Sequence, residues 1–157
     1  MEQGYRHEYK YLISRADAEL LKLRLPHIME RDTHAEGGGY TIRSLYFDDF
    51  SNSAYYEKVD GLADRAKYRI RFYDYDSSLI KLEKKEKKGS LTRKTAQTIS
   101  RDEAKALQRL TISTDPGKGD LLDELSLKIR GEGLRPMALV DYDRTPFICR
   151  DGNTRIT

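Results

Sequence analysis

The stretch from Arg65 to Lys94 constrains the fold most, because it carries eleven Lys or Arg residues and only four Asp or Glu residues. In its first part, polar and apolar residues alternate with the period of two that is typical of a β-strand. One face of this strand takes Lys67, Arg69, Arg71, Tyr73 and Tyr75, and the other takes Tyr68, Ile70 and Phe72. The pattern therefore predicts a strand with one cationic face and one apolar face.

A second strand repeats this alternation after a turn that the sequence predicts at Asp76-Ser77-Ser78. Its polar face carries Lys81, Glu83, Lys85 and Lys87, and its apolar face begins with Ile80 and Leu82. Like charges on adjacent strands repel, so a cationic face of this kind favours either solvent or an anion with many charges. A polyphosphate chain or a nucleic-acid backbone would supply the negative charges that such a face favours.

The whole chain is small and soluble in character. Its 157 residues allow one domain, and its net charge of +3 shows that the clustering of charge, not the total, points to an anionic partner. The single Cys149 rules out an intramolecular disulfide framework and suits a reducing cytoplasm. No apolar run reaches membrane-spanning length, and the N-terminus is polar. We expect a cytoplasmic protein without a membrane segment.

Further elements are expected on both sides of this hairpin. Residues 5–13 alternate as a strand with Arg6, Glu8 and Lys10 on one face. A helix is predicted to begin at Ser14, to continue at helical spacing as far as Ile28 and to pack on the back of a sheet. Other strands are predicted within 40–49, 92–99, 137–144, 147–150 and 154–157. Helices are predicted at 100–110 and 120–130, with a short helical or irregular link at 51–60. Turns are predicted at 37–39, 115–117 and 151–152.

These elements predict an α+β fold with about eight strands, joined mostly by short turns into an antiparallel sheet with the helices outside it. The concentration of Arg, Lys and Tyr on the polar face suggests that the sheet curls around this face as a barrel-like tunnel enclosing a ligand. We expect residues 1–157 to form one tunnel domain. Because the chain stops on Thr157 with nothing to close the last strand, we also expect that domain to be incomplete at its C-terminus.

Simpler interpretations account for several of the charged or reactive residues. Lys84, Lys87 and Lys88 fit a solvated strand end, and Glu83 could simply pair with neighbouring cations. The three histidines show no metal-ligand spacing. Cys149 has no nearby His or partner Cys, so we interpret it as a structural thiol.

Six sequence segments in order carry a specific resemblance: RHEYKYLIS, IRSLYFDD followed by AYYEKVDG, RAKYRIRFY, LEKKEKKG and VDYDRTPF. Together they resemble the VTC domain, the polyphosphate polymerase domain of the vacuolar transporter chaperone type, which also occurs in bacteria. This family is part of the triphosphate tunnel metalloenzyme (CYTH-like) superfamily. The resemblance implies a transferase that binds ATP and a divalent metal, Mn²⁺ or Mg²⁺, and adds the γ-phosphate of ATP to a polyphosphate chain.

The same resemblance implies roles for individual residues. It marks as catalytic Lys10, Arg69, Arg71, Lys85 and Arg144. The phosphate-binding residues that it implies are these five together with Arg93, Lys94 and Arg155. The metal-associated carboxylates would be Glu8 and Glu83. The family continues into a strand of type Leu-Glu-x-Lys and a helix with a Ser-Lys pair, and neither is present before Thr157.

The chemistry agrees with these assignments, because phosphoryl transfer needs positioning and charge neutralisation more than covalent catalysis. Arginines at alternate strand positions can hold phosphate oxygens with two hydrogen bonds each. Two alternatives stay open: a triphosphatase that passes the γ-phosphate to water, and a module that binds polyphosphate or nucleotide without catalysis. Nucleic acid is not expected as a partner, because the chain lacks a base-stacking motif.

Overall fold

The computed structural model describes residues 8–33, 35, 38–112, 120–150 and 154–157. Its described residues fall into two compact units. Unit 1 contains Glu8 and residues 43–140, and unit 2 contains residues 9–42 and 141–157. Each unit is described by itself below.

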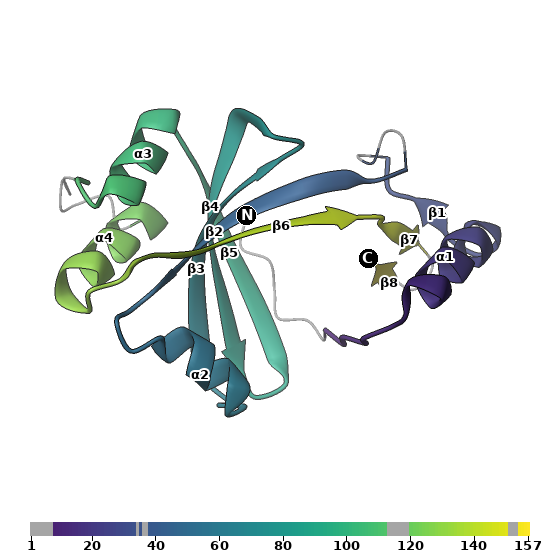
Figure 1. Ribbon diagram of the computed structural model, residues 1–157, viewed down its shortest axis with the longest axis horizontal. Helices are drawn as coiled ribbons and strands as arrows, with labels where there is room; N and C mark the ends of the chain where they lie inside the picture. Colours follow the sequence, from purple (N-terminus) through teal and green to yellow (C-terminus); the bar gives the residue numbers. More distant parts are fainter. Residues whose placement is uncertain (1–7, 34, 36–37, 113–119, 151–153) are drawn as a thin grey trace. The chain divides into compact units, whose positions relative to one another are not determined.

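The strands of the described residues form two separate sheets (Figure 1). The larger has the order β5-β4-β3-β2-β6 and consists of β2 (Tyr40–Asp48), β3 (Arg65–Tyr73), β4 (Asp76–Lys88), β5 (Leu91–Ile99) and β6 (Arg135–Arg144). The smaller has the order β1-β7-β8 and consists of β1 (Glu30–Arg31), β7 (Phe147–Cys149) and β8 (Thr154–Ile156). Antiparallel pairing joins β3 to β4, β4 to β5, β1 to β7 and β7 to β8.

The predicted fold class, α+β with antiparallel strands and helices, is therefore confirmed. Among the described residues, the two sheets are not closed into a barrel. The turns predicted at 115–117 and 151–152 lie outside the described residues. None of the helices described is long and apolar enough to span a membrane.

The turn between β3 and β4 lies two residues earlier than the sequence pattern predicts. Tyr73 pairs with Asp76, and the two residues between them, Asp74 and Tyr75, have φ angles of 51° and 57°. Two consecutive left-handed residues match the type I′ turn, whose twist suits a two-residue hairpin. The prediction of 76–78 was wrong because Ser78 donates from its backbone N–H and its hydroxyl to the Asp76 carboxylate, a local turn-like contact made inside the strand.

The core of unit 1 lies on the apolar face of β3, β4 and β5, where two helices pack. These are α3 (Arg101–Arg109) and α4 (Leu121–Gly131). The buried cluster contains Phe47, Tyr68, Ile70, Ile80, Leu82, Ile99, Leu107, Leu121 and Leu125. The alternation predicted for the hairpin is thus confirmed over the paired part of β3 and β4.

Local signals place the helix starts correctly. The helix predicted to begin at residue 100 does so, with Ser100 and Glu103 forming a capping box at the start of α3, and Asp120 caps α4 by accepting from the Asp123 N–H. The link at 51–60 contains the short helix α2 (Ser53–Val59). The backbone N–H groups of Ala54 and Tyr55 at its start donate to the Asp48 carboxylate at the end of β2.

Unit 2 departs from prediction at its N-terminal end. Helix α1 (Arg15–Arg24) begins after Ser14 as predicted, and Ser14 and Asp17 form a capping box there, but the helix gives way to a 3₁₀ turn, η1 (Leu25–His27), before Ile28. Pro26 ends the α-helix there, because proline lacks the N–H that an α-helix interior requires.

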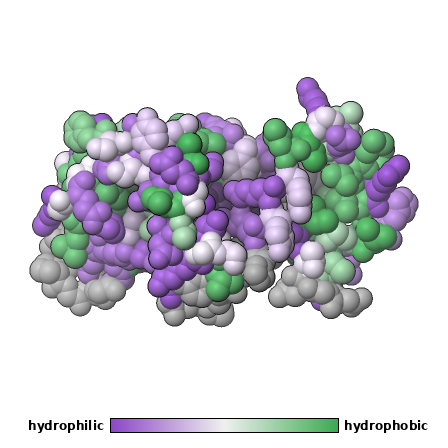
Figure 2. Space-filling model, turned by 90° about the horizontal axis from the view of Figure 1, so that it is seen from below, coloured by the Kyte–Doolittle hydropathy of each residue, from purple (hydrophilic) through white to green (hydrophobic). Residues whose placement is uncertain are grey.

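The expected packing of this helix on a sheet is also not observed. No side chain of α1 is buried, and hydrophobic side chains gather on the surface around it (Figure 2). Residues 8–13, predicted to continue a strand from residue 5, have no strand structure and are exposed. Residues 5–7 of that prediction lie outside the described residues.

The packing of α4 gives a direct test of the core. Leu125 is fully buried in the core cluster, whereas Leu127 on the same helix is 63% exposed. We expect Leu125→Ala to lower the free energy of unfolding in urea by about 2–5 kcal/mol, through lost apolar contact and a residual cavity. Leu127→Ala is the matched control and should change that free energy by less than about 0.5 kcal/mol. Equal effects of the two substitutions would contradict the placement of α4.

Candidate functional site

The polar face of the larger sheet gathers charged side chains from three adjacent strands. Arg69 on β3 lies directly opposite Glu83 on β4, and Lys67 and Arg71 lie two residues away on either side of Arg69. Lys94 comes from β5, where its direct partner on β4 is Lys85. The alternation of each strand turns these residues away from the apolar core.

Glu83 is the centre of this group, and its side chain has no exposed surface. Its Oε2 atom accepts hydrogen bonds from Arg69, at 2.8 Å from Nε and 2.6 Å from Nη2. Its Oε1 atom accepts from Lys94 Nζ at 2.8 Å, and Arg71 Nη1 lies 3.7 Å from Oε2. One carboxylate therefore holds three cations together, a group that we call the Glu83 cluster (Glu83, Arg69, Arg71 and Lys94).

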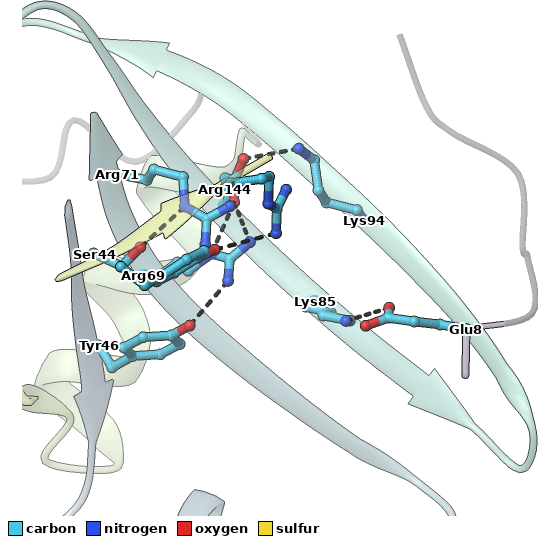
Figure 3. Close-up of polar contacts among 10 residues, drawn as sticks. Glu8, Ser44, Tyr46, Arg69, Arg71, Lys85, Lys94 and Arg144 are labelled. Carbon is cyan, nitrogen blue, oxygen red and sulfur yellow. Dashed lines mark hydrogen bonds and ion pairs between the residues drawn. The ribbon is translucent and has the colours of Figure 1, made fainter. Parts of the chain in front are cut away.

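Two neutral residues of β2 hold the arginines from the other side (Figure 3). Arg69 Nη1 donates to the Tyr46 hydroxyl at 3.0 Å, and the Arg69 guanidinium lies 5.7 Å from the centre of the Tyr46 ring. Arg71 Nε donates to the Ser44 hydroxyl at 3.0 Å. These contacts fix both guanidinium groups, because each is held by β2 as well as by the charge of Glu83.

Sequence reasoning did not single out Ser44 or Tyr46. The available signal was the alternation of β2, which places both residues on the face opposite Leu45 and Phe47. That signal becomes useful only once β2 is known to be the neighbour of β3.

The electrostatics of Glu83 reflect two opposing effects. Burial alone would raise the pKa of the carboxyl group. The charge of Arg69, the hydrogen bond and charge of Lys94 and the charge of Arg71 outweigh burial and lower the pKa from 4.5 to about 2. Glu83 is thus ionised at neutral pH, and three cations surround this one anion.

Lys85 and Arg93 have partners of their own. Lys85 Nζ lies 2.5 Å from the Glu8 carboxylate. Arg93 is adjacent to Lys94 in sequence, so it points to the opposite face of β5, where its guanidinium pairs with Glu86 at 2.8 Å. The structure thus separates Arg93 from Lys94 and from the Glu83 cluster, and the phosphate-binding role expected for Arg93 stays a prediction.

The remaining predicted residues belong to unit 2. Arg155 on β8 donates to the Asp32 carboxylate at 2.6 Å and to the Tyr40 hydroxyl at 3.3 Å. Arg144, at the end of β6, donates to the Tyr142 hydroxyl at 3.3 Å. Lys10 lies in the exposed segment before α1, outside any strand.

The described residues do not fit a metal site of the predicted kind. Within the ranges that the structure describes, no group of three or more His, Cys, Asp or Glu residues is placed to hold an ion. Both oxygens of Glu83 accept from cationic donors, and Glu8 pairs with Lys85. A carboxylate surrounded by cations is a poor ligand for a divalent ion, since the ion would add to an existing surplus of positive charge.

Comparison with known families decides the classification. A family model described as the VTC domain matches residues 5–157. The chain belongs to the VTC domain family. The recognition made from the ordered motifs is therefore confirmed, and the match spans both units.

Solved structures show the same fold. Twelve chains match, among them a candidate adenylate cyclase of Bacillus halodurans with a TM-score of 0.59 and 21% sequence identity. The alignment covers 88% of this VTC domain chain and 64% of the other chain, so the chain spans less than two thirds of that protein's length. At this identity the likeness shows the fold alone. None of the curated proteins matches the chain.

The Glu83 cluster predicts a specific acid dependence of stability. Glu83 has a folded-state pKa of about 2 and an ordinary value of 4.5, so the stability that its charge contributes is present above about pH 4.5 and is lost as pH falls towards about 2. We expect Glu83→Gln to lower the free energy of unfolding by about 3 kcal/mol or more at neutral pH, because it removes the partner of three cations. Urea unfolding over a pH series measures this effect.

The difference between wild type and Glu83→Gln should shrink as pH falls through that window. Asp64→Asn, on an exposed residue just before β3, is the control and should change stability little at any pH. A Glu83→Gln deficit that stays constant from neutral to acid pH would show that the loss does not come from the carboxylate charge.

Proposed function

We propose that this VTC domain binds ATP and polyphosphate and transfers the γ-phosphate of ATP to the polyphosphate chain. The observation that carries this proposal is the Glu83 cluster, in which Arg69, Arg71 and Lys94 surround one buried carboxylate. Three cations against one anion leave a surplus of two positive charges on the polar face of the sheet. Phosphate oxygens are the natural ligands for such a group.

The geometry supports phosphoryl transfer through positioning. Arg69 is held by Glu83 and Tyr46, and Arg71 by Ser44, so both arginines are already ordered before a phosphate binds. Ordered donors lose little freedom when the transition state forms, and this type of reaction relies mainly on aligned charge. The acceptor's terminal phosphate supplies the nucleophile, so no nucleophilic side chain is required.

The residues proposed to contact phosphates in unit 1 are Arg69, Arg71, Lys85 and Lys94. In unit 2 the family resemblance proposes Lys10, Arg144 and Arg155 for the same role. Glu83 is proposed as a positioning residue, because its oxygens are used by the cations that would contact the substrate. A divalent ion, Mn²⁺ or Mg²⁺, would enter on the phosphates of the nucleotide, as Mg²⁺ commonly does.

Two further proposals follow from the sequence. Residues 1–157 are proposed to be part of one VTC domain, which the family match across 5–157 supports. A cytoplasmic location is proposed because the single Cys149 suits a reducing compartment where ATP is present. Triphosphate hydrolysis and binding without catalysis are the alternatives to be tested.

The test is to incubate the whole chain with ATP and Mn²⁺ or Mg²⁺, and to measure both polyphosphate and free phosphate. If the gene encodes a longer chain, a version extended beyond Thr157 is tested in the same way. Polymer formation is the expected result. Phosphate release without polymer would replace the proposal with a triphosphatase, and binding of triphosphate without either product would replace it with a binding module.

The same experiment includes Arg71→Gln, which removes a charge from the Glu83 cluster and keeps a side chain able to reach Ser44. We expect triphosphate affinity and polymer formation to fall by roughly tenfold or more, as loss of a charge-assisted hydrogen bond predicts. Arg101→Gln, on the exposed first residue of α3, is the matched control and should behave like wild type. Circular dichroism and unfolding in urea confirm that each variant is folded.

A further inference from the structure

A row of three lysines crosses the polar face next to the Glu83 cluster. Lys67 on β3 lies directly opposite Lys85 on β4, which lies directly opposite Lys94 on β5. Each is two residues along its strand from the row that contains Arg69 and Glu83. Like charges directly opposite one another on neighbouring strands are destabilising, so this arrangement requires compensation.

Two of the three lysines are compensated by carboxylates. Lys85 pairs with Glu8 at 2.5 Å, and Lys94 pairs with Glu83 at 2.8 Å. The half-buried side chain of Lys67 makes no ion pair or hydrogen bond with the part of the chain that the structure describes. Within the described part of the chain, the row therefore has one ammonium group whose charge is not balanced by direct contact.

The carboxylate that acts on Lys67 among the described residues is already used elsewhere. The Asp48 carboxylate has a favourable interaction with Lys67, but its oxygens accept from the backbone N–H groups of Ala54 and Tyr55 at 2.9 and 3.1 Å. Burial, followed by the charge of Lys58, lowers the pKa of Lys67, with Asp48 acting in the opposite direction. A bound anion would offset both the burial and the neighbouring positive charge.

We propose that Lys67, with Lys85 and Lys94 opposite it, forms a second anion subsite that holds the phosphates of a chain longer than a triphosphate. The inference rests on the proposed function, in which the Glu83 cluster holds the first phosphates. The lysine row lies two residues along the strands from Arg69, which corresponds to about 7 Å, and it spans about 10 Å across three strands. It therefore extends the cationic face well beyond the arginines. A triphosphate held at Arg69, Arg71 and Lys94 can leave Lys67 without a ligand, whereas a long polyphosphate continues along the row to Lys67.

The experiment compares two ligands on the whole chain. Lys67→Met removes the charge and keeps most of the side-chain length. We expect it to weaken binding of long-chain polyphosphate by roughly tenfold and to make that binding less dependent on salt, because one phosphate contact is lost. Binding of tripolyphosphate should stay within roughly twofold of wild type. Calorimetric titration at two salt concentrations measures both affinities.

Matched variants separate a local contact from a general charge effect. Lys88→Met removes an exposed lysine from the opposite face of β4 and should change neither affinity. Lys67→Arg keeps the charge and should retain most of the affinity for long polyphosphate. Lys67→Met should unfold in urea at the same or a higher concentration than wild type, since a half-buried ammonium group without a partner is replaced by an apolar side chain.

The possible outcomes differ for the subsite and for the proposed function. Equal weakening of both ligands by Lys67→Met would place Lys67 in the triphosphate site and overturn the inference. No change for either ligand would also overturn it, while the proposed function would stand on the wild-type affinities. Failure of the wild-type chain to bind either ligand would overturn the proposed function and the subsite together.

Discussion

The rest of the site depends on the burial of one carboxylate, Glu83, among three cations. A carboxylate with no exposed surface is costly unless it is paired and hydrogen-bonded. Glu83 meets this condition through Arg69 and Lys94, with Arg71 nearby. The same condition fixes the cations, because each of them is drawn towards one point on the polar face. The structural requirement of the carboxylate thus produces a cationic surface in a defined position.

The sheet determines which residues join this surface. Alternation along β3, β4 and β5 turns their apolar side chains towards α3 and α4 and their charged side chains to the other face. The neighbouring strand β2 adds Ser44 and Tyr46. These two side chains are uncharged, so they hold Arg71 and Arg69 in place by hydrogen bonds without adding to the charge of the surface. Packing on one face and the proposed anion binding on the other therefore follow from the same pattern.

Local patterns were predictable from the sequence, and contacts between distant segments were not. The faces of the paired part of the hairpin and the helix starts at Ser14 and Ser100 depend on residues close in sequence, and these predictions were confirmed. The hairpin turn was misplaced for two reasons. Asp76 and Ser78 make a turn-like contact inside the strand, and Tyr75 adopts a left-handed conformation that its residue type does not suggest. The sequence indicated that Glu83 could pair with neighbouring cations, but not that Lys94, eleven residues later, would donate to its second oxygen.

The most direct test of the central claim is a crystal structure of the chain with tripolyphosphate bound. The account predicts phosphate oxygens within hydrogen-bonding distance of Arg69, Arg71 and Lys94, with the Glu83 carboxylate still buried beside them. Tripolyphosphate bound on another surface, with this cluster unchanged and without ligand, would show that the three cations only stabilise Glu83. The cluster would then be a structural feature of the sheet and not a phosphate site.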